Sequence, residues 1–231
     1  MEPRFCSEAL CYDDYPRTDA YYDVVEVCDM QGLNSYLEKC IEFQRASASL
    51  RHNISPPVLS VRVPAGHSDS SSSWNDALCK VYDAGGRVHV LDLSFNQKWA
   101  PTVVRLVASL AQQHRRPCKQ VSLAGLCRTA TQLSACSFDK VCGVCTDLDL
   151  SSNKLRDTDL QAVVAACSAA NYVTRLVLDG NSVGEASCKA LCEWLQRSSC
   201  SLRRLSVRDC GLFTLRPRRG HSASASGSGS A

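Results

Sequence analysis

The sequence predicts an α/β solenoid, an arc in which short parallel strands line the inner curve and helices return along the outer side. Six segments share one pattern of apolar residues. Their fourth positions are residues 61, 91, 121, 148, 176 and 205, separated by steps of 30, 30, 27, 28 and 29 residues. The stretches between them carry apolar residues at helical spacing. One such unit cannot bury its apolar face alone, so neighbouring units must stack.

The clearest unit is CTDLDLSSNKL, residues 145–155. Leu148 and Leu150 alternate with Asp147 and Asp149, so a short strand turns its leucines inward and its carboxylates outward. Asn153 follows where the chain leaves the strand, and its amide can satisfy backbone groups of neighbouring turns. The same structural role in the repeat turn is expected at Asn96, Asn181 and Cys210, whereas Leu126 occupies this position in the third unit.

These units match the pattern L-x-x-L-x-L-x-x-N/C-x-L, and the chain resembles the leucine-rich repeat family over residues 58–212, in about six repeats. Steps of about 28 residues leave room for a full helix, which is typical of the ribonuclease-inhibitor-like subclass. That subclass includes activators of the Ran GTPase, sensor ends of NLR proteins and several axonemal proteins. Helices are expected over residues 101–113, 157–170 and 185–197, with Asp157 as the N-terminal cap of the second.

The flanking segments differ in composition from the repeats. Residues 1–31 form an acidic, tyrosine-rich arm with eight carboxylates against two arginines. The arm is expected either to cover the first repeat or to dock on a basic partner. Residues 32–57 are expected to form an N-terminal capping helix, centred on residues 33–47, because terminal repeats need a cover. A Ser-rich loop at residues 67–75 and a disordered Ser/Gly-rich tail at residues 213–231 complete the domain organisation.

Composition limits the setting and the partners. A formal net charge of +3 is too small to argue for nucleic acid, and no apolar stretch reaches the 18 residues of a membrane span. The 15 cysteines are odd in number and irregularly spaced, and the acidic N-terminus lacks a signal sequence. We therefore expect a cytoplasmic protein without membrane contact. Cytoskeletal and flagellar settings are compatible with this expectation, and the nucleus stays open.

No catalytic motif is present, so we expect no enzyme, no catalytic residue, no cofactor and no metal. Cys142 and Cys145 have the spacing of a thiol-redox or zinc pair. The stronger interpretation is a buried apolar role, because Cys118 and Cys145 occupy the first inward position of their repeats. A further alternative is regulation of an enzyme such as a small GTPase, as in Ran activators. That role would need an exposed arginine on a repeat loop, and Arg87 is the candidate for it.

The strand positions that alternate with the inward apolar residues should face a partner on the concave side. The residues expected to bind it are Asp92, Asp147, Asp149, Arg175, Asp179, Arg203, Arg204 and Arg208. This surface is acidic in the middle and basic toward the C-terminal end. The alternative is that Asp147 with Arg175, and Asp179 with Arg208, are cross-strand pairs that merely neutralise the face.

The C-terminal end of the stack has no apolar helix to cover it after Leu205 and Val207. We therefore expect a protein–protein interaction module that binds a protein partner through the concave face and this open end. A homo-oligomer through the edge is compatible with this reading. The acidic stretch at residues 13–29 of a second copy would then be one candidate for the occupant, and membership of a larger assembly is equally compatible.

Overall fold

The computed structural model describes residues 24–50, 58–64, 71–96, 100–126 and 136–211. In these ranges seven strands form one open sheet, and each strand pairs in parallel with the next along the chain. The strands are β1 (Val24–Val27), β2 (Val58–Arg62), β3 (Val88–Asp92), β4 (Cys118–Ser122), β5 (Cys145–Asp149), β6 (Arg175–Val177) and β7 (Arg204–Ser206).

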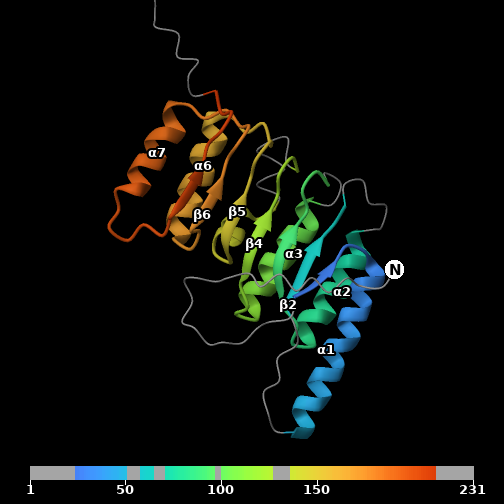
Figure 1. Cartoon of the computed structure of the whole chain (residues 1–231). Coiled ribbons are helices and arrows are strands. Elements are labelled where there is room, and N and C mark those ends of the chain that lie inside the picture. Colours follow the sequence, from blue (N-terminus) through green and yellow to red (C-terminus); the bar gives the residue numbers. More distant parts are fainter. Residues whose placement is uncertain (1–23, 51–57, 65–70, 97–99, 127–135, 212–231) are drawn as a thin grey trace, which may run out of the picture.

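The helices alternate with the strands and form an outer layer. They are α1 (Met30–Leu50), α2 (Ser71–Asp83), α3 (Ala100–Gln113), α5 (Phe138–Cys142), α6 (Asp157–Ala170) and α7 (Glu185–Leu195). Each contacts the next in this order, and together they follow one side of the sheet (Figure 1). The α/β solenoid expected from the sequence is confirmed. The arm residues 1–23, part of the Ser-rich loop and the tail from residue 212 lie outside the described residues.

Strand register follows the repeat pattern. The fourth positions of the six predicted units lie in one row across the sheet, in the order Val61, Leu91, Val121, Leu148, Leu176 and Leu205. All of these pairings are parallel. A one-residue slip anywhere would move a whole strand's apolar set to the other face, so the aligned row fixes which side chains face solvent.

A seventh strand, β1, lies inside the segment that the sequence analysis assigned to the acidic arm. Val24–Val27 pairs with β2 through Val58–Val61. The strand escaped the repeat pattern because the chain passes directly from it into α1, without the turn that ends the other strands. The helix expected over residues 33–47 lies within α1, and its buried residues Leu33, Tyr36 and Cys40 belong to the common core. The stack therefore begins one strand earlier than the sequence indicated.

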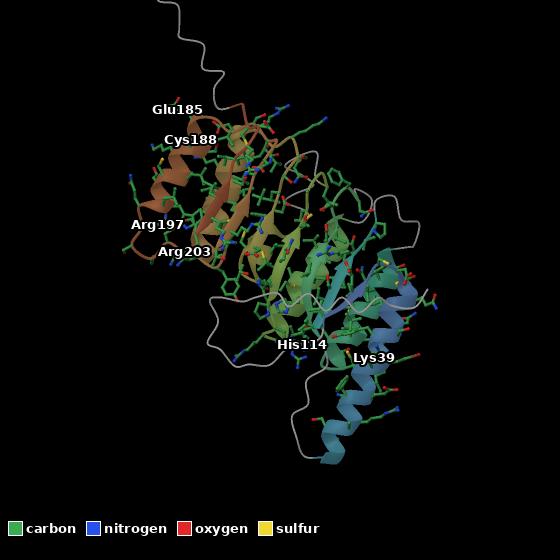
Figure 2. The ribbon with its side chains drawn as sticks, viewed as in Figure 1. Lys39, His114, Glu185, Cys188, Arg197 and Arg203 are labelled. Carbon is green, nitrogen blue, oxygen red and sulfur yellow. The ribbon has the colours of Figure 1, made fainter. Side chains whose placement is uncertain are left out.

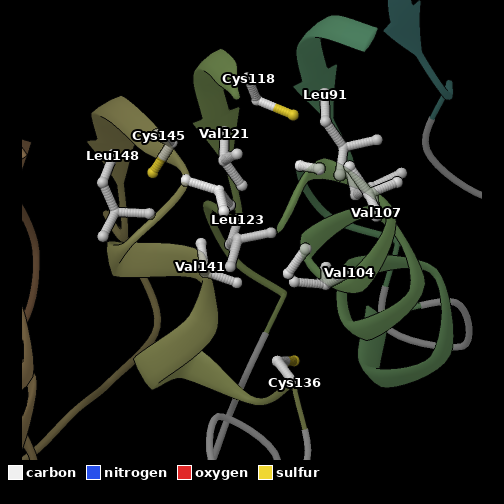
Figure 3. Close-up of a cluster of buried hydrophobic side chains, with 14 of the residues drawn as sticks. Leu91, Val104, Val107, Cys118, Val121, Leu123, Cys136, Val141, Cys145 and Leu148 are labelled. Carbon is white, nitrogen blue, oxygen red and sulfur yellow. The ribbon is translucent and has the colours of Figure 1, made fainter. Parts of the chain in front are cut away.

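The core lies between the sheet and the helices. Leu91, Val121 and Leu148 extend from successive strands toward valines of the helices, including Val104 and Val107 (Figure 3). All five are buried. Burying a side chain of this size stabilises the fold by about 1.5–3 kcal/mol. The shared core makes each repeat depend on its neighbours.

One backbone position in the turn that follows each of the strands β3 to β7 adopts a left-handed conformation. The residues in this row are Phe95, Gly125, Ser152, Gly180 and Asp209, with φ between 53° and 68°. Phe95 differs from the other four residues because its side chain is a bulky aromatic ring, which is 60% exposed. Its ring lies against Gly125, where an added Cβ would come within 2.4 Å of two ring carbons. A side chain at residue 125 would thus collide with Phe95.

Candidate protein-binding face

The sheet face turned away from the helices, here called the inner face, carries two rows of aligned side-chain positions. The first row runs through Glu26, Ser60, Val90, Gln120, Asp147, Arg175 and Arg204. The second row runs through Arg62, Asp92, Ser122, Asp149, Val177 and Ser206. These rows bring five of the eight predicted partner-binding residues onto one surface.

Three of the predicted carboxylates make local structural hydrogen bonds. Asp92 Oδ1 accepts from the Ser94 backbone N–H at 3.0 Å and from its hydroxyl at 2.6 Å. Asp149 Oδ1 accepts the Ser151 N–H at 2.9 Å. Asp179 Oδ1 accepts the backbone N–H of Arg208 at 2.8 Å, which links two repeats. These acids hold the turns at the strand ends, so their negative charge is partly satisfied.

The cross-strand side-chain pairs considered as the alternative are absent from this face among the described residues. Asp147 and Arg175 are register neighbours, yet within the described chain no salt bridge joins them. Burial lowers the pKa of Lys119, and the nearby Asp147 carboxylate opposes that shift. Likewise Asp179 binds the backbone of Arg208 and leaves the guanidinium free.

The C-terminal part of the inner face carries positive charge. Arg175 and Arg204 are exposed and lie in register on β6 and β7, and Arg208 is exposed in the turn that follows. Among the described residues, their guanidinium groups have no hydrogen-bond or salt-bridge partner. We call these three residues the basic end. Like charges directly opposite each other on adjacent strands are destabilising, so the arrangement favours a bound anion.

Arg203 does not belong to this group. Its Nη1 donates to the carbonyl of Cys200 at 2.8 Å, and the side chain lies beside α7, near Arg197, at the edge of the stack (Figure 2). At the opposite end of the sheet, Arg62 Nε lies 3.3 Å from a carboxylate oxygen of Glu26. The cation at that end is therefore paired, whereas the basic end is not.

The last strand presents an open edge. Leu205 is 37% exposed, although the equivalent Leu176 is fully buried. Leu195, at the end of α7, is 50% exposed. No strand pairs with the outer side of β7 in the described part of the chain. Unpaired backbone groups next to exposed leucines form an adhesive surface.

The turn residues join each repeat to the one before it. Asn96 Nδ2 donates to the Val63 carbonyl at 2.6 Å, and Asn153 Nδ2 donates to the Leu123 carbonyl at 2.9 Å. Further along the stack, Asn181 Nδ2 donates to the Leu150 carbonyl at 2.9 Å, and Cys210 Sγ donates to the Leu178 carbonyl at 3.2 Å. All four side chains are buried. They hold the rim of the inner face in a fixed curve.

Asp157 has a role that the sequence analysis assigned wrongly. It was expected to cap its own helix, but the N-cap of α6 is Arg156. The Asp157 carboxylate instead accepts the N–H groups of Gly184, Ala186 and Ser187, at 2.9, 3.0 and 2.8 Å, and the Ser187 hydroxyl at 2.5 Å. These hydrogen bonds, led by that from the Ser187 hydroxyl, lower the pKa of Asp157 to about 2. Asp157 therefore caps α7, the helix of the next repeat.

The absence of a side chain at Gly184 makes this contact possible. A Cβ at that position would lie 2.6 Å from the Asp157 carboxyl carbon. In the sequence, the signal for this contact is an acidic residue at the first position of one helix together with a glycine just before the helix of the next repeat. Inspection of one helix at a time misses this signal.

The cysteines of the predicted redox or zinc pair are buried. Cys145 is fully buried in register with Cys118, which confirms the stacking expected from their repeat positions (Figure 3). Burial raises the pKa of Cys118 to about 12 and raises the pKa of Cys142 and Cys145. Cys142 Sγ lies 3.4 Å from Cys167 Sγ. Thiols with raised pKa values, shielded from solvent, are poor nucleophiles.

Comparison with known families gives one match. A family model described as Leucine Rich repeat matches residues 146–164, which contain all but the first residue of β5 and the first half of α6. The match supports a leucine-rich repeat family. No curated protein matches the sequence. In the described part of the chain, no helix combines the length and apolar character that crossing a membrane requires.

Proposed function

We propose that this chain is a non-catalytic protein-interaction module that binds an acidic protein surface through the basic end of its inner face. Leucine-rich repeats suggest protein binding in general, and the repeat steps of 27 to 30 residues favour the ribonuclease-inhibitor-like subclass. The observation that carries the proposal is the register of Arg175 with Arg204, two exposed and unpaired cations on adjacent strands. Opposite charge on the partner would stabilise this arrangement and direct the encounter.

The open edge at β7 is the second part of the proposed surface. It adjoins the basic end, because Leu205 and Arg204 belong to the same edge strand, although their side chains point to opposite faces of it. A partner that covers both would bury the exposed leucine while its carboxylates meet the arginines. Such a contact combines an apolar centre with a charged rim, as stable interfaces do. We place this module in the cytoplasm, where a larger cytoskeletal or flagellar assembly would be a suitable setting.

Two other functions have less support. A Ran-activator-type role would require an arginine held in the open, whereas Arg87 is partly buried at the start of β3, where its backbone carbonyl accepts the Leu59 N–H at 3.1 Å. A thiol-redox or zinc role for Cys142 and Cys145 would require thiolates, and burial raises the pKa of both.

The test starts with affinity purification of the full chain and identification of stoichiometric partners by mass spectrometry. The affinity of a purified partner is then measured for the double variant Arg175→Glu/Arg204→Glu. The matched control is Arg105→Glu/Lys140→Glu, which makes the same charge change at exposed positions of α3 and α5. We expect Arg175→Glu/Arg204→Glu to bind the partner at least about ten-fold more weakly than the wild type does. The affinity of the wild type should also fall more steeply with salt concentration than the affinity of this variant. Equal affinities for both variants would refute the proposal.

A further inference from the structure

The acidic arm and the basic end are complementary in charge and belong to the same chain. Residues 1–23 contain six carboxylates and two arginines, together with Tyr12, Tyr15, Tyr21 and Tyr22. Since β1 takes up residues 24–27, only these first 23 residues of the predicted arm remain outside the described sheet. Residues 13–29 of a second copy are one occupant expected from the sequence, but the part of that stretch within β1 is committed to pairing with β2.

We propose that residues 1–23 bind the basic end of the inner face in the same chain and act as a built-in competitor for the partner site. The inference rests on the proposed use of the inner face. It adds the chemistry of the ligand, an acidic segment with interspersed tyrosines, and its source.

The geometry allows this contact. The arm joins β1 at one edge of the sheet, and Arg175 and Arg204 lie on the sixth and seventh strands. Six strand spacings amount to about 29 Å, and 23 extended residues span up to about 75 Å. A tether of this length keeps the acidic segment at millimolar effective concentration near its site. Binding within one chain is thus favoured over binding between dilute copies.

Charge distribution selects the basic end among the cations of the inner face. Near the start of the arm, Arg62 is already paired with Glu26. In the middle of the sheet, the Asp147 carboxylate lies close enough to influence Lys119. The unpaired guanidinium groups of the described inner face are those of Arg175, Arg204 and Arg208. Tyrosine rings can also stack on arginine, and Val177 beside Arg175 offers an apolar contact on the same face.

The test uses limited trypsin cleavage after Arg17, within the arm, in the full chain at about 0.01 M salt. A synthetic peptide of residues 1–23 in a parallel reaction gives the unprotected rate. We expect the arm of the wild type to be cleaved about ten-fold more slowly than the peptide. The protection should be lost in Arg175→Glu/Arg204→Glu and at about 1 M salt, and retained in Arg105→Glu/Lys140→Glu.

Three outcomes would overturn the proposal. One is an arm cleaved as fast as the peptide, and another is protection that survives in Arg175→Glu/Arg204→Glu. The third is protection that declines on dilution, since that would assign the contact to a second copy. The measurement needs no partner. The trypsin experiment therefore tests the arm contact even if no partner is found. The partner assay likewise tests the proposed function even if the arm does not bind.

Discussion

Substitution of Asp157 by alanine should destabilise α7, although Asp157 belongs to α6. Its carboxylate accepts four hydrogen bonds from residues 184–187, at the start of α7. Losing an N-cap side chain costs about 0.5–2 kcal/mol. Losing a negative charge at a helix N-terminus costs about a further 0.3–1 kcal/mol. We therefore expect Asp157→Ala to lower the free energy of unfolding by about 1–3 kcal/mol.

The loss should also depend on pH. Because the pKa of Asp157 is lowered from 3.8 to about 2, its contribution is complete above pH 3.8 and disappears as the pH falls through 2. The difference in stability between wild type and Asp157→Ala should therefore be constant at neutral pH. It should shrink as the pH is lowered from 3.8 toward 2.

Urea unfolding combined with hydrogen exchange measures both the size and the place of the effect. Amides of Ala186 and Ser187 should exchange faster in Asp157→Ala, while those of α6 stay protected. Asp159→Ala is the matched control, because Asp159 Oδ2 accepts only the Arg156 N–H, at 3.0 Å, within its own helix. Equal effects of the two substitutions on α7, or a stability difference that persists at pH 2, would show that the capping argument is wrong.

Three further predictions concern the turn and the strands. Asn153→Ala leaves the buried carbonyls of Leu123 and Leu150 without their side-chain donor and should cost about 2–4 kcal/mol in chemical denaturation; a loss below about 0.5 kcal/mol would contradict this role. Phe95→Asn should raise the free energy of unfolding by about 0.5–1 kcal/mol, because asparagine tolerates a φ of 62° better than phenylalanine does; a less stable variant would refute the strain. Burial lowers the pKa of His89 from 6.5 to about 4, and the nearby charges of Arg87 and Lys119 add to this shift. The free energy of unfolding of the wild type should therefore fall as the pH drops from 6.5 toward 4. In His89→Gln this decline should be smaller.

The repeat architecture could be predicted because its signal is periodic. Each predicted strand is defined by the same alternation of apolar and polar residues, and six copies reinforce one another. β1 lacked that support, since Val24–Val27 leads straight into α1 without the asparagine turn. A four-residue segment with three valines, surrounded by acidic residues, resembles many segments that are not strands. Only its pairing with β2 identifies it as part of the sheet.

The candidate site was predictable in position and less so in electrostatics. Alternation placed Asp92, Asp149, Arg175 and Arg204 on the solvent face of their strands. It could not show that the aspartates accept hydrogen bonds from the turns two residues later, because local carboxylate geometry depends on the backbone of the turn. Nor could it show that Arg203 turns to the Cys200 carbonyl. The unpaired positive charge of the described inner face is consequently carried by Arg175, Arg204 and Arg208 rather than by Arg203.

The turn at Leu126, in the third predicted unit, interrupts the series of asparagine links between repeats. Asn96, Asn153 and Asn181 each bind a carbonyl of the preceding turn, and a leucine in the same position can donate nothing. The backbone bond from Leu93 N–H to Ser122 O, at 3.0 Å, and the contact between the Ser94 and Ser122 hydroxyls, at 2.8 Å, still cross this junction. Cooperativity in a solenoid depends on the energy of each interface. Under mechanical load, the stack should fracture here first, into a block containing β1–β3 and a block containing β4–β7.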